Sequence, residues 1–374
     1  MKILFPFVGD SIGGSHISAF TLINFLKSNS KEFKVEVLAF SASDIFKNYT
    51  SFHNIEIIEH NIYLKSYSVI NLIRDLVRNF SLIRRYLIDN QIDCVHTNDI
   101  RMHLIYSFVC LFTKSKHILH LRTLPPKSKI GQLLLFTLPD FIVFISQFIQ
   151  KDMRISLRDN KFTTITNPVI SKQIPSKKEI NSKIEKFFKK KTFTISLIAN
   201  LENPNKNPYF FIDFAFKTLK LFPGKYRFII AGRTTKDIRR YILEMKAKQY
   251  EQEENFREVG FLSNLDMVWK ETDFILVPSI NEAFGRTPIE SMQQGVFVVA
   301  HNSGGHRESI QHLSNGFLFD SFEYSECIKV FEKFTKNREK YAEIVHRAYK
   351  NTSEFNYVKK HSEKIMKIYK SLDV

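Results

Sequence analysis

Cysteine is scarce in this chain of 374 residues, which has three: Cys94, Cys110 and Cys327. An odd number at these spacings matches neither a disulfide framework nor a metal-binding motif, and it suits a reducing compartment. Long apolar runs are also missing. Nowhere do about 18 apolar residues follow one another without a charge, so we expect no membrane span. The first ten residues, MKILFPFVGD, have no small-residue cleavage site, so we do not expect a signal peptide.

Acidic residues are few compared with basic ones, 38 against 55, so the net charge is +17. Nucleic acid, an anionic membrane surface and an anionic glycan can each use such a charge. No zinc-finger, homeodomain or RRM-type pattern accompanies it, so we expect no nucleic-acid partner. No Asp-x-Asp pair stands at the end of a predicted strand. We therefore expect that no divalent metal ion is required, and we expect no cofactor.

The length predicts two domains with ample core. Apolar runs of strand type alternate with helical segments in both halves, which predicts two doubly wound α/β domains. We expect the first domain at residues 1–170. A lysine-rich, polar segment at 171–191 is expected to be a linker with a leading helix, and the second domain is expected at 192–352.

The most informative stretch is Pro278–Gly305, PSINEAFGRTPIESMQQGVFVVAHNSGG. It follows the strand-type run DFILVP and begins with a polar loop. Pro288 fits the first turn of a helix over about 287–294, which Gly295 would end. The run VFVVA is a second buried strand, and Gly304-Gly305 opens another loop.

Two acids, Glu282 and Glu290, lie on either side of this helix start. Ligands of open α/β sheets bind at the carboxyl ends of the strands, and a helix start attracts phosphate. Glu282 can accept hydrogen bonds from sugar hydroxyls, and Glu290 can hold the two hydroxyls of a ribose. The alternative is a helix-start acid and a solvated helix acid without a ligand.

The residues Glu282–Arg286 (EAFGR) and Glu290–Met292 (ESM), followed by Gly295 and Gly304-Gly305, resemble the signature of the retaining glycosyltransferases of family four (group 1). That signature has two Glu residues separated by seven positions, then a Gly-Gly loop. The resemblance implies a GT-B fold, in which two Rossmann-like domains face each other across a cleft. It also implies a nucleotide-sugar donor, transfer with retention, and a C-terminal helix, here 353–374, that packs back on the first domain.

A second match lies in the loop at 200–208. The family carries an Arg there and, six residues later, a Lys, and both grip the donor diphosphate. Lys206 matches the Lys, but Asn200 stands where the Arg is usual, so one phosphate charge is in doubt. Arg286 or Arg233 can supply it; a solvated loop lysine is the alternative for Lys206. The full set expected to bind the donor is Lys206, Asn200, Gly232, Arg233, Phe284, Gly285, Arg286 and Glu290.

The first domain offers two further candidates. Gly13-Gly14 follows the first strand and permits close approach of a phosphate, as the similar Gly-Gly of the family does at the cleft; an ordinary turn is the alternative. His120 and Arg122 end another strand on one face. They are rivals for the family's catalytic position, where a cation stabilises the leaving phosphate. Capping of local backbone is the alternative. Glu282, His120 and Arg122 form the expected catalytic set.

The expected function is hexosyl transfer from a UDP- or GDP-linked donor to a glycan or lipid-linked acceptor, in polysaccharide biosynthesis of the cell envelope. A basic amphipathic helix over 67–90 predicts cytoplasmic, peripheral docking on the inner face of the membrane; a core-packed helix with a solvated basic face is the alternative. The docking residues are Arg74, Arg78, Arg84, Arg85, Lys127 and Lys129. Two other functions stay open: a catalytically silent glycan- or membrane-binding protein, and an enzyme of other chemistry on this fold, such as an epimerase or a phosphorylase.

Overall fold

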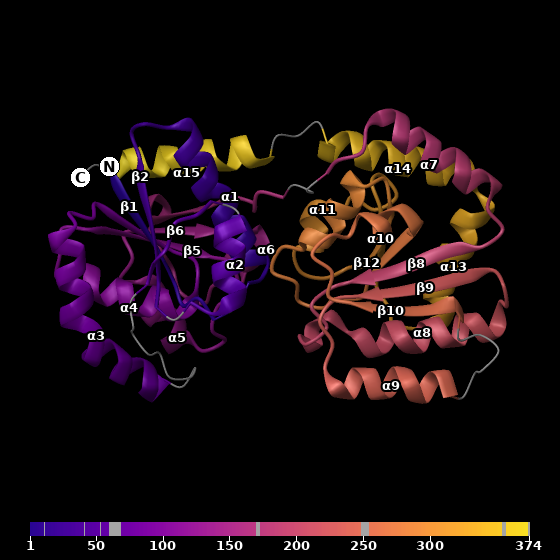
Figure 1. Cartoon of the computed structure of the whole chain (residues 1–374), viewed down its shortest axis with the longest axis horizontal. Helices are drawn as coiled ribbons and strands as arrows, with labels where there is room; N and C mark the ends of the chain where they lie inside the picture. Colours follow the sequence, from indigo (N-terminus) through magenta and orange to yellow (C-terminus); the bar gives the residue numbers. More distant parts are fainter. Residues whose placement is uncertain are drawn as a thin grey trace. The chain divides into compact units, whose positions relative to one another are not determined.

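The computed structural model describes residues 1–10, 12–40, 42–52, 54–59, 69–169, 173–247, 254–353 and 357–372. The chain divides into two compact units. The first combines Met1–Pro168 with the C-terminal Tyr357–Val374, and the second is Val169–Asn356. Each unit is a parallel sheet with helices on both faces, as Figure 1 shows.

Within the described residues, the first unit has a seven-stranded parallel sheet in the order β3-β2-β1-β4-β5-β6-β7. The central strands of this sheet are buried because helices cover both faces of a parallel sheet. They are β1 Lys2–Phe7, β2 Lys34–Ala39, β3 Ile58–Glu59, β4 Cys94–Thr97, β5 Lys116–Leu121, β6 Phe141–Phe144 and β7 Phe162–Thr164.

The helices of the first unit form two cores, one on each face of the sheet. One core includes Phe5, Leu22 and Tyr369, and the other includes Leu4, Ile83 and Tyr106. Tyr369 belongs to α15, which packs against α1, so the C-terminal helix returns to the first unit as expected. The helices are α1 Gly14–Asn29, α2 Asp44–Phe52, α3 Val69–Asp89, α4 Ile100–Cys110, α5 Lys129–Phe136, α6 Gln147–Lys151, the 3-10 turn Asp159–Lys161 and α15 Tyr357–Ser371.

The second unit has, in its described part, a six-stranded parallel sheet in the order β10-β9-β8-β11-β12-β13. Its strands are β8 Phe193–Ile198, β9 Tyr226–Ala231, β10 Phe256–Gly260, β11 Phe274–Val277, β12 Phe297–His301 and β13 Phe317–Phe319. Its helices are α7 Lys177–Lys189, the 3-10 turn Pro204–Lys206, α8 Pro208–Leu221, α9 Lys236–Ala247, α10 Asp266–Glu271, α11 Arg286–Gln293, α12 His306–Ser309, α13 Tyr324–Lys336 and α14 Arg338–Ser353.

Both sheets reverse their strand order beside their first strand. In the first unit β1 lies between β2 and β4, and in the second unit β8 lies between β9 and β11. The loops at the carboxyl ends of the two neighbouring strands part at such a switch point, which makes it the usual ligand site of doubly wound sheets. The loops after β1, β4, β8 and β11 therefore decide what each unit can bind.

The segment 171–191, expected to be a linker with a leading helix, holds α7, which Ser176 and Glu179 start as a capping box. Ile180, Ile184 and Phe187 bury its apolar face in the core of the second unit. In the first unit, the basic loop after Arg122 leads into α5, a helix that the sequence analysis missed; the hydroxyl of Ser128 accepts a hydrogen bond from the Gly131 N–H at its start.

Candidate functional site

The loop between β11 and α11 carries Glu282, and the Gly-Gly loop holds it in place. The N–H of Gly305 donates to the carbonyl oxygen of Glu282 over 2.8 Å. Gly304 has φ +59°, and a Cβ there would lie 2.4 Å from the same oxygen. A larger residue at position 304 would therefore displace the Glu282 loop, which is a structural reason for glycine.

Lys206 and Glu282, expected to bind different parts of a donor, form an ion pair through Nζ and Oε2. Their side chains are 20% and 21% exposed, so the pair lies at the surface of the unit but is partly shielded. The N–H of Ile280 donates to the carbonyl oxygen of Asn205 over 2.9 Å, which joins the two loops that carry the pair. The structure thus brings a cation and an acid together at the carboxyl ends of β8 and β11.

A second pair lies one turn into α11. Arg286 Nη2 lies 3.1 Å from Glu290 Oε1, at the i, i+4 spacing of a helix. The two side chains are 15% and 24% exposed. Gly285, with φ +83°, is the N-cap of this helix, and Phe284 before it is buried. Both predicted acids of the second unit are therefore paired with predicted cations.

His306 is a member of this cluster that the sequence analysis did not single out. It is completely buried, and a Cβ on Gly285 would lie 2.8 Å from its Cδ2 atom. Burial lowers the pKa of His306, and the nearby Glu282 raises it while Lys206 lowers it, so the imidazole lies close to both. Its position directly after Gly304-Gly305 was the only signal in the sequence.

The other residues predicted to bind the nucleotide-sugar donor lie after the ends of β8 and β9. Asn200 is exposed, and its side chain accepts a hydrogen bond from the N–H of Glu202 over 3.3 Å, which forms a local turn. Gly232 has φ +139°, and a Cβ there would lie 1.7 Å from the carbonyl oxygen of Ala199, so the backbones meet directly. The Arg233 guanidinium lies 4.9 Å from the centre of the Phe261 ring, a cation–π contact.

In the first unit, Gly13 is the N-cap of α1, and both Gly13 and Gly14 are exposed. The N–H of Gly13 donates to His16 Nδ1 over 3.1 Å. Arg101 reaches the same region, with Nη2 2.8 Å from the Asp10 carboxylate. The loop after β1 is therefore an exposed helix start with charged groups around it, which is compatible with an anionic ligand.

His120 and Arg122 contact each other rather than standing alone. Both are buried, and Arg122 Nη2 lies 3.2 Å from His120 Nδ1. The Arg122 Nε–H also donates to Asn98 Oδ1 over 2.7 Å, and the Nη1–H donates to Asn167 Oδ1. Arg122 thus joins the loop after β4, the end of β5 and the loop that follows β7.

A network of neutral imidazoles surrounds this pair, and the C-terminal helix takes part in it. His96 lies with Nε2 3.1 Å from His120 Nδ1 and with Nδ1 2.6 Å from the Tyr369 hydroxyl. The ring of His361 stacks on His120 at 5.7 Å. Burial lowers the pKa of His120 far below its ordinary value, and the charge of Arg122 lowers it further. The contributions of α15 gave no recognisable signal in the sequence.

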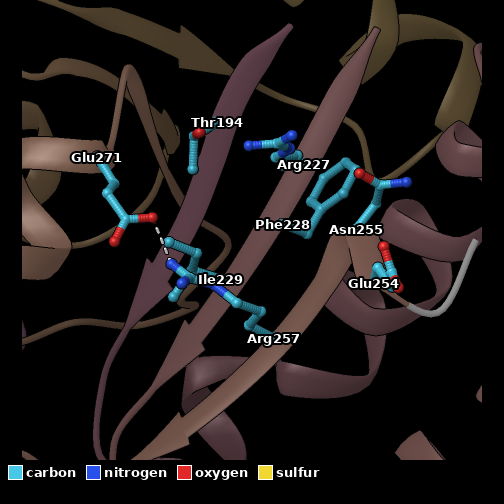
Figure 2. Close-up of a pocket in the computed structure, with 8 residues that line it drawn as sticks. All are labelled: Thr194, Arg227, Phe228, Ile229, Glu254, Asn255, Arg257 and Glu271. Carbon is cyan, nitrogen blue, oxygen red and sulfur yellow. Dashed lines mark hydrogen bonds and ion pairs between the residues drawn. The ribbon is translucent and has the colours of Figure 1, made fainter. Parts of the chain in front are cut away.

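Figure 2 shows a different hollow in the second unit, of about 100 Å³. It lies at the amino ends of the strands, because Thr194, Arg227 and Arg257 are each the second residue of β8, β9 and β10. Arg257 forms an ion pair with Glu271 at its wall. None of the predicted site residues lines this hollow, and it is at the opposite edge of the sheet from Glu282.

In the part of the chain that the structure describes, no three His, Cys, Asp or Glu side chains lie close enough together to hold a metal ion. No helix there is long and apolar enough to cross a membrane.

Residues 177–351 match the model of the family described as glycosyl transferases group 1. No curated protein matches the chain significantly. Among solved structures, HepE from Anabaena, crystallised with UDP and glucose, is 19% identical with a TM-score of 0.79; the match covers 99% of this chain and 100% of that one. HepE was also solved with UDP-glucose and with UDP.

Two further structures are similar over nearly the whole chain. A glycosyltransferase from Rickettsia africae is 17% identical, with a TM-score of 0.80, over 99% of this chain and 98% of that one. Sucrose-phosphate synthase from Thermosynechococcus elongatus is 13% identical, with a TM-score of 0.78, over 99% and 98%. At these identities the likeness shows the fold, and it confirms the expected two-domain α/β GT-B fold. Together with the family match, it supports a glycosyltransferase of group 1.

Proposed function

We propose that the protein is a retaining hexosyltransferase of the family-four type, which moves a sugar from a UDP- or GDP-linked donor to a hydroxyl acceptor. The observation that carries this proposal is the Lys206–Glu282 pair beside the start of α11. A diphosphate needs cations and helix N–H groups, and a sugar hydroxyl needs an acceptor. The group 1 match over residues 177–351 contains the whole cluster.

In this proposal, the diphosphate lies against Lys206 and the first turn of α11, while Glu290 holds the ribose and Glu282 orients the sugar. Because Lys206 and Glu282 pair with each other in the structure, donor binding must replace that ion pair. The diphosphate would take the place of Glu282 at Lys206, and sugar hydroxyls would take the place of Lys206 at Glu282. Both charges keep partners, so the exchange carries a small desolvation penalty.

The first unit would supply the acceptor side, near Gly13-Gly14, His120 and Arg122. The bond between the anomeric carbon and the phosphate oxygen breaks, and the new glycosidic bond forms on the same face of the sugar. The acceptor hydroxyl passes its proton to the leaving phosphate. The permanent charge of Arg122 would stabilise that phosphate. Because Arg122 donates to His120 Nδ1, the His120 proton resides on Nε2, which makes Nε2 a donor.

A thermal-shift series with UDP, GDP, UDP-glucose and GDP-mannose tests the donor site. Ligands that bind only the folded state raise the melting temperature. We expect one nucleotide and its sugar to stabilise the protein and Lys206→Ala to abolish most of the shift. Lys178→Ala, an exposed α7 residue of the same unit, should leave it unchanged. No shift with any of the four would favour the catalytically silent alternative.

The acceptor is proposed to be lipid-linked, because one side of the first unit has the composition of a membrane-docking surface. In the first half of α3 two polar side chains, Asp75 and Asn79, are buried, whereas Ile73 and Val77 are 57% and 72% exposed. The helix α4 packs against both α3 and α5. We call this surface the α3–α5 face; its exposed apolar residues are Ile73, Val77, Leu82, Ile88, Phe108, Leu111, Phe112, Ile130, Leu133 and Leu134.

The basic residues predicted to dock lie among these apolar ones. Arg74, Arg78, Arg84 and Arg85 are exposed on α3, and Lys127 and Lys129 are exposed before and at the start of α5. Each such cation near an anionic leaflet contributes about 1 kcal/mol. We propose that this face holds the protein peripherally on the cytoplasmic side of the membrane, where it takes part in polysaccharide assembly of the cell envelope.

Liposome sedimentation tests the α3–α5 face. Binding should require anionic lipid, fall with added salt, and drop when the four α3 arginines become Gln. The matched control changes the same charge on the second unit: Lys177, Lys178, Lys186 and Lys189 of α7 to Gln. Equal binding to neutral vesicles, or equal losses in both variants, would contradict specific docking and leave the transferase proposal standing.

A further inference from the structure

His306 has a hydrogen-bonding atom that nothing in the described structure uses. Its Nδ1 lies 3.0 Å from the carbonyl oxygen of His301. A carbonyl only accepts, so Nδ1 carries the proton and Nε2 presents a lone pair. Nε2 is buried and has no hydrogen-bond partner among the described residues. Buried polar atoms are nearly always paired, so an unpaired one calls for an explanation.

The Nε2 atom lies in the proposed binding site for the sugar-nucleotide donor. A Cβ on Gly285 would be 3.2 Å from Nε2 and 3.5 Å from the Cγ atom of Glu282. The imidazole and the Glu282 side chain therefore both lie next to Gly285, on one side of the α11 N-cap. Burial lowers the pKa of His306, so the ring is neutral at pH 7 and Nε2 keeps its lone pair.

Among the parts of a nucleotide sugar, only some can use such an acceptor. A diphosphate at pH 7 offers oxygen acceptors and no proton, so it suits Lys206 and the helix start instead. A sugar hydroxyl has a proton to donate. Glu282 supplies a second acceptor beside Nε2, so the two together match two neighbouring hydroxyls of one sugar.

We infer that Nε2 of His306 accepts a hydrogen bond from a hydroxyl group of the donor sugar, next to a hydroxyl held by Glu282. The inference rests on the proposed function and makes His306 a specificity-determining residue of that site. It requires the sugar to carry a free hydroxyl at the position that faces His306. The nucleotide without its sugar would gain nothing from this residue.

Three variants separate this role from simple packing. His306→Phe keeps the ring and removes both polar atoms. His306→Asn can keep the hydrogen bond to the His301 carbonyl but has no acceptor at the Nε2 position. His306→Gln can place an oxygen near that position. His346→Phe, a partly buried histidine on α14, is the matched control.

The experiment measures the affinities of UDP and UDP-glucose for each variant by calorimetry, or those of GDP and GDP-mannose if GDP is the nucleotide that stabilises the wild type. We expect His306→Phe and His306→Asn to weaken binding of the sugar nucleotide about 3- to 10-fold, the range of one neutral hydrogen bond. The nucleotide alone should bind as before. His306→Gln should recover part of the loss, and His346→Phe should show none.

Donor analogues that lack one hydroxyl at a time complete the test. One of them should bind the wild type as weakly as the parent sugar nucleotide binds His306→Phe, and it should lose nothing further in that variant. Equal losses for the nucleotide and its sugar would assign His306 to packing and overturn the inference, as would unchanged affinities in all variants. A wild type that binds neither nucleotide nor sugar nucleotide would overturn the proposed function, and the inference with it.

Discussion

The two units carry their polar clusters at the same place, the carboxyl ends of parallel strands beside a switch point, but the clusters are built differently. In the second unit, Lys206–Glu282 and Arg286–Glu290 are ion pairs with side chains about a fifth exposed. In the first unit, His96 and His120 are completely buried and neutral, and Arg122 is the charged group among them.

The difference indicates which of the two clusters can take up a charged ligand. Partly exposed ion pairs can exchange partners with a charged ligand, because each charge already has a partner to give up. A buried network of imidazoles cannot take up charge without desolvation, so it holds groups in fixed positions. We therefore interpret the second unit as the place where charge is bound, and the first as a rigid support for the loops after β1, β4 and β5.

The largest expected effect is that acid destabilises the first unit before the second. Burial lowers the pKa of both His117 and His361 to about 3 in the folded state. The unfolded chain therefore binds more protons between about pH 6.5 and pH 3. The stability is fully present above about pH 6.5 and is lost as the pH falls, by roughly 2 kcal/mol for each such group at pH 5. Hydrogen exchange resolved by peptide measures it; simultaneous loss of protection in both units would remove this distinction.

The next largest expected effect is the loss of donor affinity when Lys206, the proposed cation beside the diphosphate, is removed. Lys206→Ala should weaken donor binding about 10- to 150-fold, the value of one or two hydrogen bonds to a charged group. The rate should fall too, because the diphosphate is charged in both the ground state and the transition state. Calorimetry with UDP and initial rates with the sugar nucleotide measure the two effects. Unchanged UDP affinity would place the phosphates elsewhere and break the comparison between the units.

Substitutions of Glu290 and Glu282 should affect different quantities, nucleotide affinity for the first and turnover for the second. Glu290→Ala should weaken binding of the nucleotide itself about tenfold, since a ribose loses charge-assisted hydrogen bonds while the released Arg286 offsets part of the loss. Glu282→Gln should lower turnover about tenfold and leave nucleotide affinity within about twofold, because it contacts only the sugar. Nucleotide affinities and turnover of both variants decide it; the reverse pattern would exchange the two roles.

The smallest expected effect is at Asn200. The residue is exposed and shapes a local turn, so an Arg there meets no buried obstacle. Asn200→Arg should preserve UDP affinity or raise it by about two- to fivefold, as one partly solvated ion contact does. A large loss of affinity would show that another cation already occupies that space.

Much of the fold was predictable from the sequence because its signals are local. The strand β11 lies within the predicted run DFILVP, and β12 overlaps the predicted run VFVVA, since short apolar runs ended by turn residues have few alternatives. The helix start at Gly285 and Pro288 was equally local. The placement of Lys206 and Glu282 in one site followed from the resemblance to the family, because the motifs that carry the resemblance belong to one binding site.

Other features depend on contacts between distant parts of the chain. The helix α5 was missed because it is short and its apolar residues face both ways: Ile130, Leu133 and Leu134 are exposed, whereas Leu135 and Phe136 are buried. On α3, Asp75 and Asn79 are buried where apolar periodicity predicted core. Sequence periodicity reports which residues prefer burial, and it cannot report which side a surface helix turns toward its own unit.

The sequence by itself determined the alternation of strands and helices, the division into two α/β units and the acid motif of the second unit, because each of these depends on neighbours along the chain. Only the tertiary structure decided that Arg122 contacts His120, that His361 and Tyr369 of α15 complete the first unit's network, and that His306 lies against Gly285. Those contacts join residues that packing brings together across the fold, and the spacing of residues along the sequence does not show them.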